Sequence, residues 1–191
     1  HQGGLSDGIG VLANRLLREG FSVLIMQMPL IGWNKCKTFQ LPDRKVEVTS
    51  HDQLVSAVEG RGGSALRFFI EPVVVGINYF LARRPDHSDI TMIGLSGGGW
   101  TTHIAPAVDP RIRLSIPVAG AYPLYLRSCY PGSVGDAEQM LAALYHDRAS
   151  WLDLFILGGY GAGRRQIQLL NQYDPCCFYG LGYTTYEDKV S

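Results

Sequence analysis

The stretch "ITMIGLSGGGWTTHI", which runs from Ile90 to Ile104, decides the fold of this chain. Its first half is a short apolar run rich in β-branched residues, which is typical of a strand buried in a parallel sheet. Its second half places Trp100 and Ile104 four residues apart, on one face of a helix. Ser96 stands between the two halves, among glycines. The pattern therefore predicts a strand, a tight turn at Ser96 and a helix.

Helical spacing of apolar residues also appears in three other segments. In the first, Ser6 or Asp7 can act as the N-cap and Gly20 as the end. In the second, Pro72 indicates either a helix start near Glu71 or a kink. The expected helices span Ser6–Glu19, Leu66–Arg83 and Asp136–Leu157, the last with a break near Ser150.

Short apolar runs alternate with these helices and predict buried strands. The expected strands span Phe21–Met28, Ile90–Leu95, Arg113–Ala119 and Arg165–Tyr173. Strands that alternate with helices predict an α/β layer fold with a mainly parallel sheet.

The length and composition predict a single domain over residues 1–191. The chain is 46% hydrophobic, which is enough for a sizeable core. Residues 31–50 form a long polar segment without a clear period, and long loops in compact domains tend to be lids or binding loops. We expect a lid or insertion at 31–50 and another at 122–160.

The charge balance excludes some classes of partner. Lys plus Arg and Asp plus Glu both number 17, and no basic run or stripe occurs, so we expect neither a nucleic acid nor an anionic membrane as partner. No apolar stretch approaches the roughly 20 residues that span a bilayer. Adjacent cysteines rarely bond to each other, so the cysteines are interpreted as mostly reduced thiols, and we expect no metal or cofactor. They are Cys36, Cys129, Cys176 and Cys177.

Gly94, Ser96 and Gly98 fit the spacing G-x-S-x-G, the nucleophile elbow, at the strand–helix junction that this motif requires. Glycine avoids clashes where the backbone turns sharply, and the N-terminus of the following helix favours negative charge near the serine. A phosphate-binding P-loop would need a lysine before the hydroxyl residue, and a dinucleotide site would need G-x-G-x-x-G. The stretch has neither pattern, which leaves a plain structural turn as the alternative.

With "GLSGGGW" at the elbow and "HQGG" at His1–Gly4, the chain resembles the α/β-hydrolase family over nearly its whole length. The lead-in "SDITMIGLSGGG" is most similar to the dienelactone hydrolase, acetyl xylan esterase and prolyl-oligopeptidase branches. The resemblance implies a three-layer α/β/α sandwich with a mainly parallel sheet, incomplete because the family's first strands would precede this sequence. It also implies a serine hydrolase acting on a small-molecule ester or, as second choice, on an amide or peptide.

The resemblance assigns roles to several residues. Ser96 would be the nucleophile, and the backbone N–H groups of Gly97 and of Gln2 or Gly3 would form the oxyanion hole. Gln2 stands where the family usually has glycine. Asp174 follows the last predicted strand, where the family places the acid that orients a histidine. An ordinary Asp-Pro turn is the alternative for Asp174, and the alternative acid is Asp153, which we expect in the middle of a helix.

In this family the histidine follows the acid, yet no histidine follows Asp174. We therefore expect the base beyond Ser191, after one more strand. The histidines that are present are interpreted differently. His1 belongs to the expected oxyanion loop, and His103 is a packed helix residue. His51 and His87 lie in exposed segments, and His146 lies on a helix before the acid.

Trp33 and Trp100 are candidates for lining a substrate pocket, although aromatic side chains more often pack in a core. The rival interpretation of the whole chain is a non-catalytic binding module with the α/β-hydrolase fold, in which the serine persists without a working triad. A histidine after a further strand in the complete reading frame would favour the enzyme.

Overall fold

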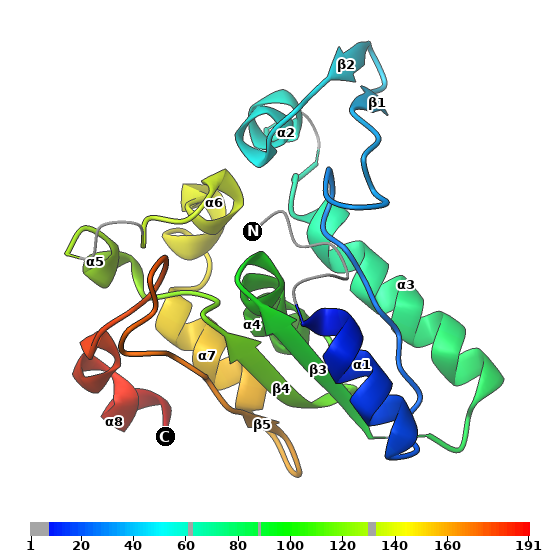
Figure 1. Cartoon of the computed structure of the whole chain (residues 1–191). Helices are drawn as coiled ribbons and strands as arrows, with labels where there is room; N and C mark the ends of the chain where they lie inside the picture. The colour runs from blue at the N-terminus through cyan, green and yellow to red at the C-terminus, as the bar shows by residue number, and fades with distance from the viewer. Residues whose placement is uncertain (1–7, 61–62, 88, 130–132) are drawn as a thin grey trace. The chain divides into compact units, whose positions relative to one another are not determined.

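The computed structural model describes residues 8–60, 63–87, 89–129 and 133–191 of the chain (Figure 1). The chain divides into two compact units, His1–Gly76 and Ile77–Ser191, and helix α3 (Arg67–Arg83) belongs to both. The described part of the chain combines helices with a parallel sheet, which confirms the α/β class.

The first unit begins with helix α1 (Ile9–Arg18), which confirms the helix predicted over this segment. Gly20 adopts a positive φ of 89°, and the Phe21 N–H donates to the Leu16 carbonyl at 3.0 Å. Gly20 thus ends the helix as expected, because glycine has no Cβ to clash in this conformation. The expected N-caps, Ser6 and Asp7, lie outside the described residues, and Gly8 precedes the helix.

The predicted strand Phe21–Met28 is wrong. The segment carries no strand, and its apolar side chains are largely exposed, for example Phe21 at 60% and Leu24 at 57%. Apolar composition alone does not make a strand, because the backbone N–H and C=O groups also need a neighbouring strand to pair with. No such pairing occurs for residues 21–28 within the described chain.

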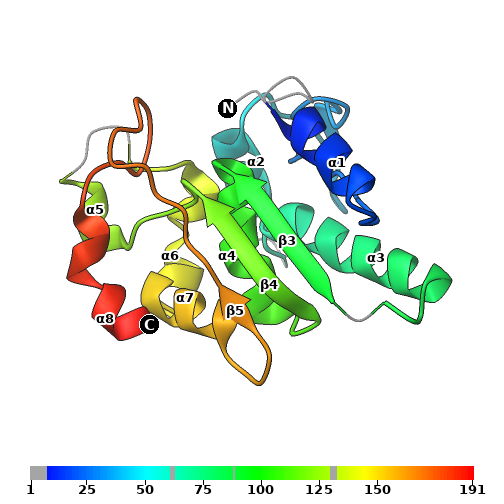
Figure 2. The same ribbon diagram turned by 60° about the horizontal axis from the view of Figure 1, so that its bottom comes forward.

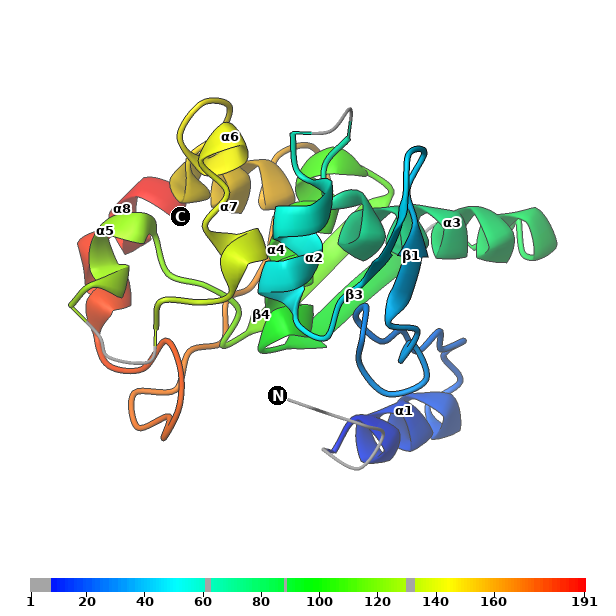
Figure 3. The ribbon, with the colours of Figure 1, turned by 90° about the horizontal axis from the view of Figure 1, so that it is seen from above.

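Residues 31–50 contain more structure than expected. Strands β1 (Thr38–Gln40) and β2 (Lys45–Glu47) pair in an antiparallel hairpin, visible in Figure 3. Helix α2 (His51–Val58) follows, with the Ser50 side chain accepting a hydrogen bond from the Gln53 N–H as N-cap. Helix α3 begins at Arg67, before Pro72, and continues beyond it.

The sheet of the second unit contains the strand that was predicted before Ser96. Strands β3 (Ile90–Leu95), β4 (Ile112–Val118) and β5 (Arg165–Gln166) lie in the order β3-β4-β5 and are parallel (Figure 2). An isolated parallel bridge between Val118 and Leu169 continues the pairing beyond β5. The strand predictions for β3 and β4 are confirmed, and the last strand is shorter than the predicted Arg165–Tyr173.

Helices α4 (Gly97–Val108) and α7 (Trp151–Gly159) pack together against this sheet. A Cβ at Gly94 would meet the Gly98 carbonyl oxygen and the Thr102 hydroxyl, so this side of β3 faces α4. Residues on the other side alternate with it. Two of them, Ile93 and Leu95, are 38% and 42% exposed. The expectation that β3 is buried on both faces is therefore wrong.

The predicted helix Asp136–Leu157 is divided into shorter pieces, with the expected break at Ser150. Ser150 caps α7 in a capping box with Asp153: the Ser150 hydroxyl accepts from the Asp153 N–H, and the Asp153 carboxylate accepts from the Ser150 N–H. Asp153 therefore lies in the first turn of α7 and not in the middle of a helix. Figure 3 shows α8 (Glu187–Val190) beside α7. The remaining elements are α5 (Leu124–Arg127), η1 (Ala137–Gln139), α6 (Ala142–Tyr145), η2 (Gly182–Thr185) and α8 (Glu187–Val190).

Candidate functional site

Ser96 occupies the junction between β3 and α4. Its backbone has φ 56° and ψ −118°, a combination that L-residues rarely adopt. The Ser96 N–H donates to the Val118 carbonyl at 2.9 Å, which holds the turn against the end of β4. Its side chain is half-buried and makes no capping hydrogen bond to α4. The local structure therefore holds Ser96 in a strained turn and gives its hydroxyl no capping role.

The glycines around Ser96 allow the backbones to approach closely. A Cβ at Gly94 would clash with the Gly98 backbone, and a Cβ at Gly99 would lie 2.6 Å from the Val118 carbonyl oxygen. A Cβ at Gly120, two residues beyond the end of β4, would in turn clash with the Gly99 backbone. A Cβ at Gly98, in contrast, would meet nothing within 4 Å. The expectation that only glycine fits on both sides of the serine is thus confirmed at Gly94 and wrong at Gly98, where a side chain would have room.

The first turn of α4 supplies donors for an anion. The first N–H groups of a helix have no partner within the helix, and here they belong to Gly97 and the glycines after it. They point toward the end where Ser96 lies, together with the positive end of the helix dipole. Gln2 and Gly3, which are expected to provide the second oxyanion donor, lie outside the described residues.

Asp174 lies beyond the carboxyl end of the strand segment that starts with β5. The Leu169 N–H donates to the Pro117 carbonyl and the Ala119 N–H donates to the Leu169 carbonyl, both at 2.9 Å, so this segment runs parallel to β4 up to its last residues. The carboxyl ends of parallel strands meet at one edge of a sheet. Leu169, which continues this segment beyond β5, is level with Val118 and with Leu95 at the end of β3, and β3 lies two strand spacings away from it, about 10 Å. The sheet therefore brings Ser96 and the Asp174 turn to the same edge.

The Asp174 carboxylate is fixed through one of its two oxygens. Oδ1 accepts hydrogen bonds from the Cys176 N–H at 2.9 Å and from the Cys177 N–H at 3.1 Å. This is the Asx-type turn that the Asp-Pro alternative predicts. The same geometry leaves Oδ2 without a hydrogen bond to the described residues, so the turn and an orienting role for the carboxylate are compatible.

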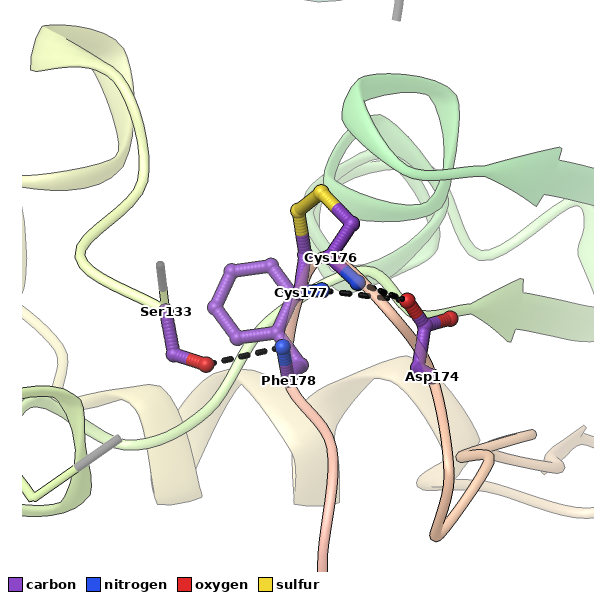
Figure 4. Close-up of a disulfide and its surroundings, with 5 residues drawn as sticks. All are labelled: Ser133, Asp174, Cys176, Cys177 and Phe178. Carbon is purple, nitrogen blue, oxygen red and sulfur yellow. Dashed lines mark hydrogen bonds between the residues drawn. A yellow bond between two sulfur atoms is a disulfide. The ribbon is translucent and has the colours of Figure 1, made fainter. Parts of the chain in front are cut away.

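Cys176 and Cys177 form a disulfide (Figure 4). The interpretation of these two residues as reduced thiols is therefore wrong, because the turn that follows Asp174 brings the two neighbouring sulfur atoms together. Cys36 and Cys129 are free and exposed, as expected. In the sequence, the only feature that relates to this bond is that the two cysteines are adjacent. Adjacent cysteines usually do not bond to each other, so the bond was not predictable from the sequence.

Backbone strain is concentrated at this edge of the sheet. Among the described residues of the second unit, the non-glycine residues with positive φ are Ser96 at 56°, Ala119 at 45° and Phe178 at 53°. Ser96 follows β3, Ala119 follows β4, and Phe178 belongs to the turn beyond β5. Strained non-glycine residues persist where the surrounding structure holds them, and they cluster at functional sites.

His103 is a packed helix residue, as predicted. It is 1% exposed, its Nδ1 lies 2.8 Å from the Gln166 side-chain oxygen, and its ring packs against Phe155 at 4.5 Å between centroids. Burial lowers the pKa of His103 to about 3, although the hydrogen bond to Gln166 acts in the opposite direction. A buried imidazole that is neutral at neutral pH and is paired with Gln166 is not placed to serve Ser96.

The other described histidines of the second unit are also not placed beside Ser96. His87 precedes β3 and so lies at the amino end of that strand, away from the edge that carries Ser96. The side chain of His146 is 82% exposed, and its Nδ1 lies 2.8 Å from the Asp147 carboxylate. His51 belongs to the first unit, where its Nε2 lies 2.9 Å from the Pro29 carbonyl oxygen, and His1 lies outside the described residues.

Trp100 has no accessible surface to offer a substrate. It is fully buried one turn after Ser96, and its indole N–H donates to the Tyr145 hydroxyl at 2.8 Å. The structure thus shows the core alternative for this residue. Trp33 is 84% exposed in the first unit, and its role as a pocket residue stays a prediction.

The buried guanidinium of Arg127 was not expected from the sequence. It lies 4.8 Å from the Trp151 ring centroid, and its Nε donates to the Tyr122 carbonyl at 2.8 Å. Burial lowers the pKa of Arg127 to about 10, so the group stays charged at neutral pH. Nothing in the sequence distinguishes Arg127 from the exposed arginines, because its burial depends on partners that are distant along the chain.

A hollow of about 370 Å³ is lined by residues of α7, β5 and α8, among them Phe155, Gln166 and Glu187. It includes neither Ser96 nor Asp174, so it is separate from the edge of the sheet where these residues lie.

In the described residues, no helix has both the length and the apolar character that crossing a bilayer requires.

Comparisons with known proteins do not show which family this chain belongs to. No protein-family model, curated protein or solved structure matches the chain.

Proposed function

We propose that this protein is a serine hydrolase that cleaves a carboxylic ester, or as second choice an amide or peptide bond, through an acyl-enzyme intermediate. The parallel sheet of the second unit is then the central layer of a three-layer α/β/α sandwich of the α/β-hydrolase type. Ser96 is the nucleophile, Asp174 orients a histidine, and that histidine lies outside these 191 residues.

The backbone of Ser96 carries this proposal. A φ of 56° at a serine costs free energy, roughly 1–3 kcal/mol, and a Cβ at the nearby Gly94 or Gly99 would clash with neighbouring backbone atoms. A turn that served only to connect a strand and a helix would place glycine at the strained position itself. The retained serine therefore supports a role for its hydroxyl, as in the nucleophile elbow.

The chemistry follows from the positions of the groups. The Ser96 Oγ attacks the carbonyl carbon of the substrate while the histidine takes the hydroxyl proton, and the negative charge that develops on the carbonyl oxygen is met by the Gly97 N–H. The intermediate then collapses, the histidine gives its proton to the leaving alcohol, and an acyl group remains on Ser96. Water, deprotonated by the same histidine, releases the acid.

A fluorophosphonate probe tests the assignment of Ser96, since such probes phosphonylate an activated serine. On the full-length protein we expect labelling at Ser96, loss of labelling in Ser96→Ala, and unchanged labelling in Ser56→Ala, which alters an exposed serine of α2. Equal labelling of the Ser96→Ala variant and the parent would remove Ser96 from the mechanism. A complete absence of labelling in the parent would favour the non-catalytic binding module.

A further inference from the structure

The disulfide between Cys176 and Cys177 is directly connected to the Asp174 carboxylate. The bond closes a small covalent ring that includes the Cys177 N–H and carries the Cys176 nitrogen as a substituent, so the positions of both nitrogen atoms depend on the conformation of the ring. Both N–H groups donate to Asp174 Oδ1, at 2.9 and 3.1 Å, as Figure 4 shows. In the described structure these are the hydrogen bonds that the carboxylate accepts, so the ring decides where the carboxylate lies.

The far side of the ring is anchored in the core. The N–H of Phe178 donates to the hydroxyl of the fully buried Ser133 at 2.8 Å, and the Phe178 side chain is only 4% exposed. The loop is also closed at its base, where the Gly180 N–H donates to the Gln172 carbonyl at 3.0 Å. Because Phe178 is held in place, we expect a change in the conformation of the ring to displace the Asp174 side of the loop.

The ring is accessible to a reagent from solution. Cys176 is exposed, whereas Cys177 and Asp174 are half-buried. A thiolate can thus approach the Cys176 sulfur, while the carboxylate that depends on the ring stays partly covered. An accessible disulfide of this kind belongs to the class that redox partners open and close.

We propose that the Cys176–Cys177 pair is a redox site that positions Asp174: the closed disulfide holds the two N–H groups that fix the carboxylate, and reduction releases it. The consequence for turnover rests on the proposed function, in which Asp174 orients the base. The consequence for the turn itself does not depend on that function.

The reaction is a thiol–disulfide exchange with a dithiol reductant. One thiolate of the reductant attacks the Cys176 sulfur, the bond between the two cysteines breaks, and the Cys177 sulfur leaves as a thiolate that takes up a proton. In the resulting mixed disulfide, one sulfur of the reductant is bound to the Cys176 sulfur. The second thiolate of the reductant attacks that reductant sulfur and releases the Cys176 thiolate, which is also protonated. The reductant loses two electrons and two protons and ends as a disulfide, and an oxidised disulfide compound reverses the reaction.

The test uses the full-length protein with Cys36→Ser and Cys129→Ser, so that only the pair remains among the cysteines of this sequence. Cysteine-selective ¹⁵N labelling then reports amide hydrogen exchange at Cys176 and Cys177 before and after treatment with dithiothreitol. We expect exchange of both amides to become at least about tenfold faster on reduction, because each loses a hydrogen bond to a charged oxygen. Oxidised glutathione should restore the slow exchange.

Variants at the pair and at Asp174 serve as controls. The Cys176→Ser/Cys177→Ser variant, with serine-selective ¹⁵N labelling, should exchange the amides at positions 176 and 177 rapidly without reductant and should not respond to dithiothreitol. Asp174→Ala should exchange the two cysteine amides rapidly in both redox states. Equal exchange in the oxidised and reduced parent would overturn the proposal, as would two free thiols at the pair that oxidised glutathione does not close.

Turnover provides the second readout. Reduction should lower the turnover of the parent by about 10², the loss that a misplacement of about 1 Å typically causes, and should leave the double serine variant unaffected. If Asp174→Asn keeps the turnover of the parent, the assignment of Asp174 in the proposed function fails, and amide exchange still decides whether the redox site exists. If Asp174→Asn loses turnover and reduction of the parent does not, the redox proposal is overturned and the proposed function stands.

Discussion

At the scale of single residues, the turn at Ser96 combines strain with a reactive group. Its positive φ, 56°, is one that glycine adopts readily and that serine adopts only under constraint. The hydrogen bond from the Ser96 N–H to the Val118 carbonyl and the close packing of Gly94 and Gly99 supply that constraint. The fold thus stabilises a local conformation that the serine alone would not take.

The Ser96→Gly variant should therefore be more stable than the parent, by about 1 kcal/mol. The relief of roughly 1–3 kcal/mol of strain exceeds the 0.5–1 kcal/mol that glycine costs through its greater freedom in the unfolded chain. Ser96→Ala keeps the Cβ and the strain, so its free energy of unfolding should stay close to that of the parent. Urea unfolding of the full-length protein measures both. A Ser96→Gly variant less stable than Ser96→Ala would show that the turn is not strained.

Replacement by asparagine, first at Asp174 and then at Asp153, shows which of the two candidate acids orients the histidine. In Asp174→Asn the amide oxygen still accepts the N–H groups of Cys176 and Cys177, so the turn should remain, while the other position becomes an N–H donor that repels an imidazole N–H. We expect kcat to fall by roughly 10⁴, the loss seen for the corresponding change in chymotrypsin, with KM and stability nearly unchanged.

Asp153→Asn is the matched control. It weakens the capping box with Ser150 and should lower the free energy of unfolding by about 1 kcal/mol without changing kcat. Both variants are assayed with the same ester, and their unfolding is followed in urea. The reverse pattern, with kcat lost in Asp153→Asn and retained in Asp174→Asn, would transfer the orienting role to Asp153.

At the scale of elements, the sequence predicted those parts whose signals are local. The strand at Ile90–Leu95, the helix after Ser96 and the end of α1 at Gly20 all follow from apolar periodicity and glycine placement within a few residues. For the same reason the strand–turn–helix arrangement at Ser96 was predictable, since it needs only a strand, a serine between glycines and a helix.

The predictions that failed depended on partners distant along the chain. Phe21–Met28 has the composition of a strand but no strand beside it, and the exposure of Ile93 depends on which face of the sheet the helices cover. The Cys176–Cys177 bond depends on the turn that Asp174 organises. Neither pairing nor burial is encoded in the period of a segment, so these features appear only when the elements are assembled.

The packing of α4, α7 and β5 around His103 gives the stability a pH dependence. The pKa of His103 is lowered from 6.5 to about 3 by burial, so below about pH 6.5 the unfolded chain binds a proton that the folded chain does not. The contribution to stability is complete above pH 6.5 and is lost as the pH falls toward about 3, with a slope of up to about 1.4 kcal/mol per pH unit.

The His103→Gln variant isolates this effect, because glutamine does not titrate and the other titrating groups are shared. We expect the free energy of unfolding of the parent to fall relative to that of the variant as the pH decreases from about 6.5 to about 4. Urea titrations of both proteins across this range measure the difference. Parallel curves would mean that His103 takes up its proton in the folded state as readily as in the unfolded state.

At the scale of the whole molecule, the parallel sheet assembles residues that are far apart in the sequence. Ser96 follows β3, the strained Ala119 follows β4, and the Asp174 turn follows the segment that begins with β5. Because the strands are parallel and adjacent, all of these positions lie at one edge of the sheet. The candidate site can therefore be located from the strand order alone, whereas the neighbouring disulfide requires the detailed conformation of one loop.

The position of the histidines leads to a prediction for the isolated chain. Within the described part of the second unit, His103 is buried and paired with Gln166, His87 lies at the amino end of β3, and His146 is exposed beside Asp147. A protein of residues 1–191 should therefore hydrolyse nitrophenyl acetate about 10²–10⁴ times more slowly than the full-length protein, because the proposed function places the general base outside these residues.

Extension of the chain by its native downstream segment should restore the rate, and replacement of the first histidine that follows a strand in that segment should abolish it again. The matched control is His146→Gln in the full-length protein, which alters an exposed histidine and should leave the rate unchanged. Full activity of residues 1–191 would contradict the prediction. It would place the base within this sequence and make His103 or His146 the first residue to test, and for His103 the pH dependence of the rate would then have to agree with a pKa lowered to about 3 by burial.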